Sequence, residues 1–460
     1  TIRFDIAGAE DFTMTANTLT ALSGSTIKTN TIAETTSTSG VTIDGLLIKD
    51  STAAFADGAV ATPSITNTGD LNTGVYFPAA DTVGVTAGGT EVFRFGSSGD
   101  GHYGSVTGAK NMIINGSFMV AQRGTSAVTG IGGSNYTRYP TDMWMHYGTS
   151  SAARYSASQN TPGFGSGQPR AGYGLLIDCT TVESSIASGD VSAVLHKIEA
   201  QNIFHLQYGT AGAAVVTVSF WVSSPKSGIH TVSLYTEDTN WSCPIEYTIS
   251  SADTYEHKVV TFPAPTSSAT ITNDTGAGLW LVFPLVVGSS YQGTNNTWAV
   301  GENYGTSNSQ NLMDNTSNNF KLALVQMELG SAFTGFEHEY IGTTLQKAQR
   351  YYERYTLDQV SGQYFMNGFM FSTQYICGLH DFKTVKRSAP TITFTTAATW
   401  KIYYLTTGAV CTHVGVQSTA SVYGVGLFGR DSAAPLTAGQ AGVLGRDSTD
   451  TTYIEISAEL

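Results

Sequence analysis

Short segments in which hydrophobic and polar residues alternate recur through the middle of the chain, and Gly, Asn, Ser and Pro separate them. A period of two places every second side chain on one face of a β-strand, and turn residues between such runs are typical of antiparallel sheets. Many short strands joined in this way indicate a β-sandwich or jelly roll. We expect strands at 172–179, 215–224, 229–236, 256–264, 278–287 and 321–329.

The pattern is weaker toward the N-terminus. Residues 1–62 are rich in Thr and alternate only in short pieces, which bury few large side chains. They predict a β-rich fibre shaft segment in which several chains share one narrow core; a flexible linker is the alternative. Residues 63–108 predict a small β cassette, with turns at 70–73 and 87–89, and a Gly-rich hinge after it.

We place the sandwich segment at 109–341. A helical periodicity follows it. The sequence TLQKAQRYYERY (344–355) contains good helix formers and predicts a linker helix within 342–356. Residues 357–460 return to alternation and predict a C-terminal β tip domain. The expected fold class is therefore all-β with one short helix.

The composition agrees with an all-β fold and limits the chemical classes of binding partner. Charged residues make up 12% of the chain, about half the usual share, and Gly is abundant at 50 residues. The net charge of −13 argues against a nucleic acid, whose phosphates need Lys and Arg, and against an anionic lipid surface. Uncharged, hydroxyl-rich partners such as glycans remain open.

The spacing of the cysteines argues against a zinc or redox motif, and the length of the longest apolar run argues against a membrane helix. No C-x-x-C pair occurs, so a zinc or redox motif is not indicated, and buried free thiols are favoured over disulfides at Cys179, Cys243, Cys377 and Cys411. The apolar run at 278–288 is much shorter than the ~20 residues that a membrane helix needs, and it contains Pro284. A buried strand is expected there, and no membrane insertion.

One short stretch resembles a known cassette. Residues 63–95 are similar to a unit common in tail-fibre proteins of tailed bacteriophages, through Asn72-Thr73-Gly74-Val75-Tyr76-Phe77-Pro78, Ala80-Asp81-Thr82 and Gly88-Gly89-Thr90-Glu91.

The middle of the chain carries a second resemblance. It is carried by Ile113-Ile114-Asn115-Gly116-Ser117-Phe118, Gln122-Arg123-Gly124, Thr141-Asp142-Met143-Trp144, Ser219-Phe220-Trp221-Val222-Ser223-Ser224, Val325-Gln326-Met327-Glu328-Leu329-Gly330-Ser331, Thr334, Phe336-Glu337 and Gln349-Arg350-Tyr351-Tyr352. Through these residues, the segment 109–356 resembles the carbohydrate-binding-module-like sandwich found near the tips of phage tail fibres. In such sandwiches the first and last strands, here about 112–119 and 321–329, lie close together. We expect Phe333 and Phe336 to cap the open end of the core.

These resemblances imply an elongated homotrimeric fibre in the virion tail, assembled in the host cytoplasm. Its expected function is host-cell surface recognition and adsorption by binding surface glycan or lipopolysaccharide, and its other partners are tail or baseplate proteins. No nucleic acid, membrane insertion or cofactor is expected. Two alternatives stay open: a tailspike-like polysaccharide depolymerase, and a structural virion fibre without receptor contact.

Catalytic motifs do not support an enzyme. The sequence has no G-x-S-x-G, H-E-x-x-H or P-loop, and its two G-x-G-x-x-G matches precede no predicted helix. A depolymerase needs only two carboxylates about 5–10 Å apart, which scattered acids such as Glu237, Asp238, Glu246, Asp274, Glu302 and Asp314 leave open. We expect no enzymatic activity and interpret these acids as solvated.

The candidate site is predicted from the chemistry by which proteins bind sugars. An aromatic ring stacks on the apolar face of a sugar, while amide, carboxylate and guanidinium groups bind its hydroxyls. Loop residues of these types are the glycan candidates, with loop packing as the alternative; Trp144, Trp221 and Trp280 lie in strand-like stretches and are expected in the core. The candidates are Tyr136, Arg138, Tyr139, Asp238, Asn240, Trp241, Tyr291, Asn296, Trp298 and Tyr304.

A calcium site is the remaining possibility that the residues raise. Asn115, Asp142 and Glu328 would approach one another if the first and last strands adjoin. No loop has calcium-binding spacing, so satisfied polar pairs are expected instead, and no metal.

Overall fold

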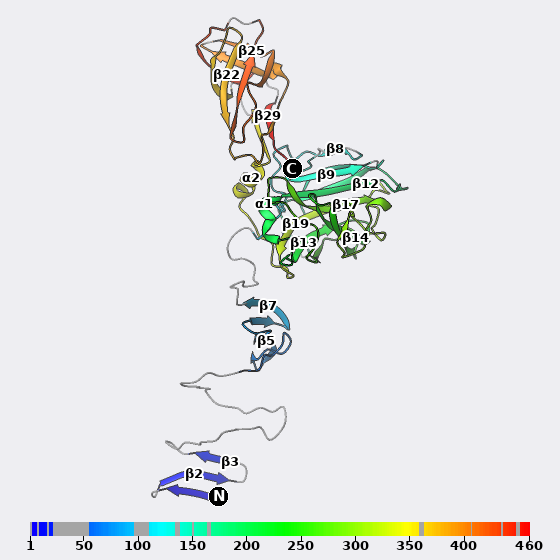
Figure 1. Ribbon diagram of the computed structural model, residues 1–460, viewed down its shortest axis with the longest axis vertical. Helices are drawn as coiled ribbons and strands as arrows, with labels where there is room; N and C mark the ends of the chain where they lie inside the picture. Colours follow the sequence, from blue (N-terminus) through cyan, green and yellow to red (C-terminus); the bar gives the residue numbers. More distant parts are fainter. Residues whose placement is uncertain are drawn as a thin grey trace. The chain divides into compact units, whose positions relative to one another are not determined.

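The computed structural model describes residues 2–6, 9–15, 18–21, 55–95, 110–133, 139–149, 151–162, 167–357, 363–405, 407–433, 436–447 and 451–460. The chain divides into two compact units, Thr1–Val92 and Phe93–Leu460, and strands dominate both (Figure 1). The predicted all-β class is confirmed: within the described ranges one helix is longer than four residues.

The first unit contains two small sheets. Strands β1 (Ile2–Ile6), β2 (Ala9–Thr15) and β3 (Thr18–Ala21) form an antiparallel sheet, and β4 (Ile65–Asn67), β5 (Asp70–Tyr76), β6 (Val83–Ala87) and β7 (Thr90–Phe95) form a second one in sequence order. Residues 22–54 lie outside the described part, so the shaft segment stays a prediction.

One of the two predicted turns in this unit is wrong. Gly88 and Gly89 have φ of +59° and +75°, so the turn expected at 87–89 is confirmed. The other expected turn, at 70–73, lies inside β5, and the chain reverses just before it, where the Gly69 amide donates to Asn67 Oδ1 at 2.9 Å. An Asx side chain that bonds the backbone two residues on takes the place of the predicted turn.

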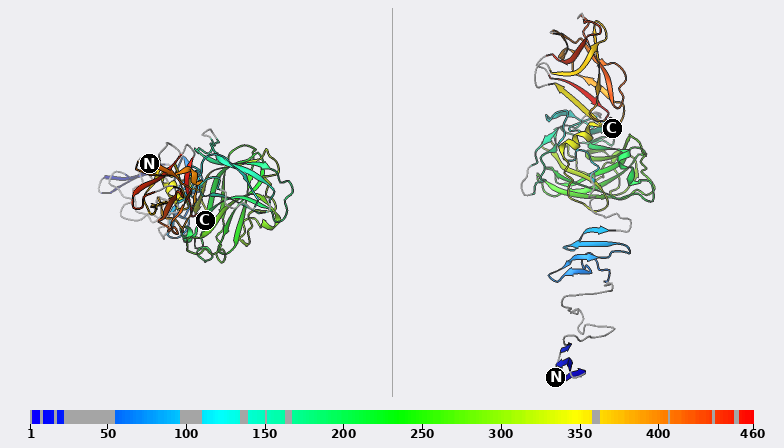
Figure 2. Two further views of the ribbon diagram at one scale, coloured as in Figure 1. Left: turned by 90° about the horizontal axis from the view of Figure 1, so that it is seen from above. Right: turned by 90° about the vertical axis from the view of Figure 1, so that its left-hand side faces the viewer.

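The second unit begins with the predicted β-sandwich, seen from two further sides in Figure 2. One six-stranded sheet has the order β16-β13-β19-β11-β10-β8 and the other β18-β15-β14-β17-β12-β9. The strands are β8 (Val128–Ile131), β9 (Trp144–Thr149), β10 (Arg154–Asn160), β11 (Gly174–Thr181), β12 (Val191–Glu199), β13 (Val216–Ser223), β14 (Gly228–Thr236), β15 (Trp241–Ile249), β16 (Glu256–Phe262), β17 (Ala277–Val287), β18 (Ala299–Val300) and β19 (Asn319–Leu329). A short helix α1 (Ala200–Ile203) follows β12.

The main core lies between these two sheets. Phe220 on β13 and Phe283 on β17 are fully buried, and their ring centroids are 5.1 Å apart. Trp144 is fully buried in the same core, as predicted. Trp280 is buried in a separate hydrophobic core cluster, so the prediction that it is a core residue is confirmed too. Trp221 is only half-buried, beside another small cluster. Alternation alone identifies a strand but not which of its faces meets the core.

The longest apolar run forms the buried strand β17, as predicted. Pro284 has no N–H to donate, yet β17 lies between β14 and β12 in its sheet. The register with β12 shifts between Ser192 and Ala193, and Ala193 is opposite Pro284, so the irregularity falls where the strand cannot donate. Among the described residues, no helix is long and apolar enough to cross a membrane.

All four cysteines are buried and free, which confirms the expected thiols and rules out the disulfide alternative in this structure. Burial raises the pKa of each thiol, that of Cys243 to about 12. They are therefore protonated, inert side chains, and Cys179, Cys243 and Cys411 fill core volume.

The segment at 110–123, which we call the entry segment, lies beside β19 as expected but is not a strand. The Met112 amide donates to Met327 O at 2.9 Å, and the Val325 amide donates to Gly116 O at 2.8 Å. The expected role of Phe333 is wrong, because its ring is 40% exposed and contacts His257 at 4.7 Å. Phe336 likewise packs in the small cluster with Trp221 rather than over the end of the main core.

Gly116 is required at this contact. A Cβ atom at Gly116 would lie 2.0 Å from Val325 O, whereas a Cβ atom at Gly172 would meet nothing within 4 Å. We predict that Gly116→Ala lowers the free energy of unfolding by about 1–3 kcal/mol, because the entry segment must move away from β19. Chemical denaturation measures this, and Gly172→Ala is the matched control with an unchanged midpoint. Equal stability of the two variants would show that the contact is not tight.

Helix α2 (Ile341–Gln349) connects the sandwich to a C-terminal domain formed by residues 352–460. The helix prediction over 344–355 is wrong at its C-terminal end, where β20 (Tyr352–Leu357) begins. This domain has a small sheet of order β20-β29-β23 and a seven-stranded sheet of order β25-β24-β28-β21-β22-β27-β26. The other strands are β21 (Tyr364–Met370), β22 (Tyr375–Asp381), β23 (Thr391–Phe394), β24 (Trp400–Tyr404), β25 (Thr407–Val410), β26 (His413–Val416), β27 (Gly424–Arg430), β28 (Ala441–Arg446) and β29 (Thr452–Ser457).

Candidate functional site

Several of the predicted glycan residues come together at one edge of the second sandwich sheet. The turn between β14 and β15 carries Asp238 and Asn240, both exposed, and Asn240 has a φ of +55°. The Gly301 amide donates to Asn240 O at 2.7 Å, and Trp241 pairs with Val300 on β18. The turn and β18 are thereby held side by side.

The segment before β18 contributes two more candidates. Asn296 is exposed with a φ of +57°, and its amide donates to Pro244 O on β15 at 2.8 Å. Trp298 is half-buried; its Nε1 donates to Pro263 O at 2.6 Å and its ring contacts Tyr208 at 5.7 Å. We call the group at this edge of the sheet the edge site; it comprises Asp238, Asn240, Trp241, Asn296 and Trp298.

The edge site is built on ordered structure. Asp238 Oδ2 accepts from the Thr272 amide at 2.7 Å, which fixes one carboxylate oxygen. Trp241 is half-buried at the first position of β15, so its backbone is set by the sheet. An indole on a rigid strand beside exposed amides and a carboxylate has the chemistry of a sugar-stacking position.

Two other candidates lie on the outer face of the same sheet, where they pack with aromatic residues. Tyr291 and Tyr304 stack with centroids 6.0 Å apart and 8° between planes. Tyr304 is fully buried, so the prediction that it contacts a ligand is wrong in this structure, and burial raises the pKa of its hydroxyl. Tyr291 remains half-buried. The loop that carries them folds back onto the sheet, which loop composition does not indicate.

Residues that the sequence analysis did not select fill this outer face. Tyr235 and Trp280 are 6% and 7% exposed with ring centroids 4.9 Å apart, and Lys197 Nζ lies 4.1 Å from the centroid of Trp280. Tyr147 donates to Glu302 Oε2 at 2.6 Å. Tyr147 and Tyr235 alternate along their strands with residues of the main core. This alternation is a sequence signal that could have placed both side chains on the face opposite the core. The cluster covers itself and leaves little ring surface for a ligand.

The remaining candidates are not part of the edge site. Tyr139 is half-buried and lies under the Arg123 guanidinium, with 4.5 Å from Cζ to the ring centroid. Burial raises the pKa of the Tyr139 hydroxyl. Tyr136 and Arg138 lie outside the described residues.

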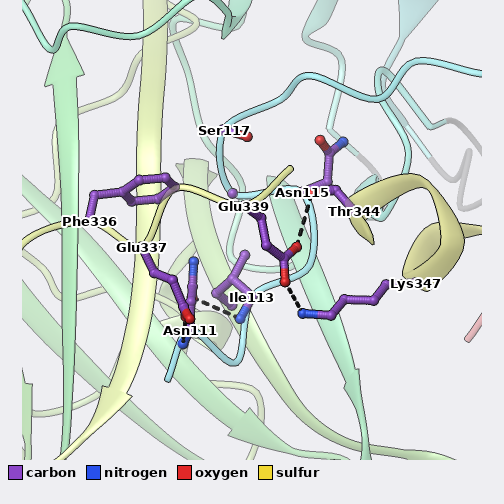
Figure 3. Close-up of a pocket in the computed structure, with 10 residues that line it drawn as sticks. Asn111, Ile113, Asn115, Ser117, Phe336, Glu337, Glu339, Thr344 and Lys347 are labelled. Carbon is purple, nitrogen blue, oxygen red and sulfur yellow. Dashed lines mark hydrogen bonds and ion pairs between the residues drawn. The ribbon is translucent and has the colours of Figure 1, made fainter. Parts of the chain in front are cut away.

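A small polar cleft lies between the entry segment and helix α2 (Figure 3). Its volume of about 20 Å³ accommodates a water molecule but not a sugar ring. Glu337 Oε2 accepts from the Asn111 amide at 2.8 Å, and Glu339 accepts from Thr344 Oγ1 at 2.9 Å and pairs with Lys347. These acids already have partners, so the cleft closes the sandwich rather than binding a ligand.

The three residues considered for calcium have protein partners. Asp142 accepts from the Gln122 amide at 2.6 Å, and Glu328 Oε1 accepts from the Thr334 amide at 3.0 Å. Asn115 Nδ2 donates to Asp142 O at 3.0 Å. Within the described residues no group of three or more His, Cys, Asp or Glu side chains could hold a metal ion.

Comparison with known proteins gives structural matches only. No protein-family model and no curated protein matches the chain. The enzymatically active domain of tailspike protein 4 from bacteriophage CBA120 matches at 10% identity and a TM-score of 0.24, over 44% of this chain and 22% of the tailspike chain. A family 11 carbohydrate-binding module from Clostridium thermocellum, in complex with a β-1,3-1,4-mixed-linked tetrasaccharide, matches at 11% identity and a TM-score of 0.21, over 47% of this chain and 99% of the module.

The N-terminal cellulose-binding domain of Cellulomonas fimi β-1,4-glucanase C matches at 9% identity and a TM-score of 0.22, over 41% of this chain and 90% of that domain. TM-scores in this range do not establish a shared fold. The choice of the edge site therefore depends on the geometry of this chain alone.

Proposed function

We propose that this protein is a tail-fibre adhesin of a tailed bacteriophage, which attaches the virion to its host by binding a surface glycan or lipopolysaccharide. The observation that supports this most directly is the edge site, where a half-buried Trp241 on a strand lies beside the exposed Asn240 and Asp238. The composition agrees, since a net charge of −13 with few cations favours a partner that is bound through rings and uncharged polar groups.

The proposed mechanism is adhesion through repeated weak contacts. One aromatic ring on one sugar gives a modest affinity, so several chains must engage the same polymer at once. We propose a homotrimer in which the C-terminal domains associate, and other tail or baseplate proteins hold the fibre on the virion. We propose no hydrolysis of the glycan.

The exposed apolar residues of the C-terminal domain support this association. Phe369 on β21 is opposite Cys377 on β22, so it lies on the same sheet face as Leu379, two residues further along β22. Phe369, Phe371 and Leu379 are 53%, 63% and 70% exposed, and the two Phe rings are 6.5 Å apart. We call these three the C-terminal apolar patch. Clustered, exposed apolar side chains are a feature of interaction surfaces.

The edge site is tested by removing its ring and its amide separately. We predict that Trp241→Ala lowers the affinity for a bound glycan about tenfold, since the stacking contact contributes on the order of 1–2 kcal/mol. Asn240→Gly keeps the positive φ and removes only the amide, so a smaller loss is expected. Isothermal titration calorimetry measures both. Trp221→Ala on the other sheet, also half-buried, is the control with unchanged affinity. An equal loss in Trp221→Ala would contradict this placement of the site.

A further inference from the structure

The entry segment, the sandwich and the C-terminal domain meet at Arg123, in a contact that we call the joint. Arg123 Nη2 pairs with Glu459 Oε1 at 2.8 Å, just after β29, and Nη1 lies 3.9 Å from Asp142 Oδ1, just before β9. The Gln122 side chain donates to Asp142 Oδ1 at 3.0 Å and to Tyr352 O at 2.8 Å. Each of the three parts therefore supplies a group to the same small volume.

The joint is poor in water and holds more acids than cations. The side chains of Asp142, Glu459 and Arg123 are 1%, 11% and 22% exposed. The rings of Tyr139 and Tyr352 lie 4.5 Å and 3.4 Å from Arg123 Cζ, which restricts the guanidinium. Arg123 Nη1 is buried without a hydrogen-bond acceptor. Arg123 thus lies beside two buried carboxylates and forms a direct hydrogen bond with only one of them, Glu459.

Two other arginines lie near the joint, and one of them, Arg387, opposes the raised pKa of Glu459 from a distance. Arg387 donates to the backbone oxygens Ala458 O, Glu459 O and Thr275 O at 2.7, 2.5 and 2.9 Å. Arg354 donates to Arg123 O at 3.1 Å and lies 3.9 Å from its own acid, Glu455 Oε1. Neither cation forms a direct side-chain bond to Asp142 or to Glu459.

We propose that Asp142 and Glu459, which both adjoin Arg123, together take up one proton, and that binding of this proton tightens the joint between the sandwich and the C-terminal domain. Two buried carboxylates beside a single guanidinium cannot both ionise without a penalty, and uptake of one proton relieves it. Burial raises the pKa of both carboxyl groups, against the opposing effect of Arg123 on each.

The direction of the pH effect follows from these raised pKa values. A carboxyl group whose pKa is raised by folding stabilises the folded state in its protonated form, and this stability is lost as the pH rises through the raised pKa. The joint should therefore be tighter at pH 5 than at pH 7.5. This is opposite to the usual ion pair, such as Glu256 with Lys258 at 2.5 Å, where the pKa of Glu256 is lowered and acid weakens the pair.

A neighbouring ion pair of the same interface has one acid for one cation. Glu199 accepts from Arg350 Nη2 at 2.6 Å, from Arg350 Nε at 2.8 Å and from the Tyr351 hydroxyl at 2.7 Å. This acid has its own cation, and the pKa of Arg350 is raised mainly by that bond.

Hydrogen–deuterium exchange of the full chain tests the proposal, with rates corrected for the intrinsic effect of pH. Peptides from the entry segment and from residues 455–460 are expected to be about tenfold more protected at pH 5 than at pH 7.5. Asp142→Asn and Glu459→Gln each remove one acid, so both are expected to be as protected at pH 7.5 as the wild type at pH 5. Glu256→Gln is the control and should keep the wild-type pH profile.

Three results would overturn the proposal. Protection in the wild type could be independent of pH, or it could fall on acidification as for an ordinary ion pair. Alternatively, both Asp142→Asn and Glu459→Gln could retain the wild-type pH dependence. The wild-type profile alone decides the first two outcomes, so the test does not depend on either variant folding normally.

Discussion

Lys386→Ala is expected to lower the free energy of unfolding by about 3–5 kcal/mol, the usual cost of removing one partner of a buried ion pair. Lys386 and Glu353 are both 0% exposed, and Lys386 Nζ lies 2.6 Å from Glu353 Oε2. Without the ammonium group, the Glu353 carboxylate stays buried and loses its charged partner, and it keeps only neutral donors, the Tyr355 hydroxyl and the Lys383 amide at 3.3 Å. Chemical denaturation measures the loss.

Two further variants separate the charge from the packing. Replacing both partners, Lys386→Met with Glu353→Leu, should recover most of the stability, because no unpaired charge is then buried. Lys401→Ala removes a more exposed lysine that is 3.0 Å from Asp447, and should cost less than 1 kcal/mol, as is usual for surface pairs (about 0–1 kcal/mol). If Lys386→Ala were no worse than Lys401→Ala, the Lys386–Glu353 pair would not be buried in solution.

Phe369→Asp combined with Leu379→Asp is expected to separate the proposed homotrimer into single chains. The substitutions place two carboxylates in the C-terminal apolar patch, where burial against another chain would carry a large desolvation penalty. Both side chains are more than half exposed, so the isolated chain has no reason to unfold. Size-exclusion chromatography with light scattering measures the mass.

A matched control comes from the same domain. Leu405 is 85% exposed at the turn after β24, and Leu405→Asp should leave the mass unchanged because it lies outside the C-terminal apolar patch. A wild-type protein that is a single chain at micromolar concentration would contradict the proposed association. A variant that keeps the wild-type mass would place the contact elsewhere.

Strand periodicity predicted much of the sandwich because turn residues mark the ends of its strands in the sequence. The runs at 229–236 and 278–287 became β14 and β17 with nearly the same ends. The helix at 344–355 was overextended, since Tyr352–Leu357 pairs with β29 about a hundred residues later in the chain. A local pattern carries no information on such a distant partner, and aromatic residues tolerate the strand.

The sequence predicted the types of residue in the candidate site better than it predicted where these residues lie in the fold. Asp238, Asn240 and Trp241 adjoin in sequence, so their proximity followed from the turn. Their meeting with Asn296 and Trp298 depends on the pairing of β15 with the two-residue strand β18, which is too short to recognise in sequence. Tyr304 was selected for its loop, and only the fold of that loop onto the sheet shows that the ring is buried.

The most direct test of the account is size-exclusion chromatography of purified bacterial surface polysaccharides, each run with and without the protein. The account predicts that at least one intact polymer co-elutes with the wild type, and that Trp241→Ala loses most of this shift while Trp221→Ala keeps it. A polymer that elutes at smaller sizes after incubation would contradict adhesion without hydrolysis. Unchanged elution of every polymer would contradict glycan binding itself.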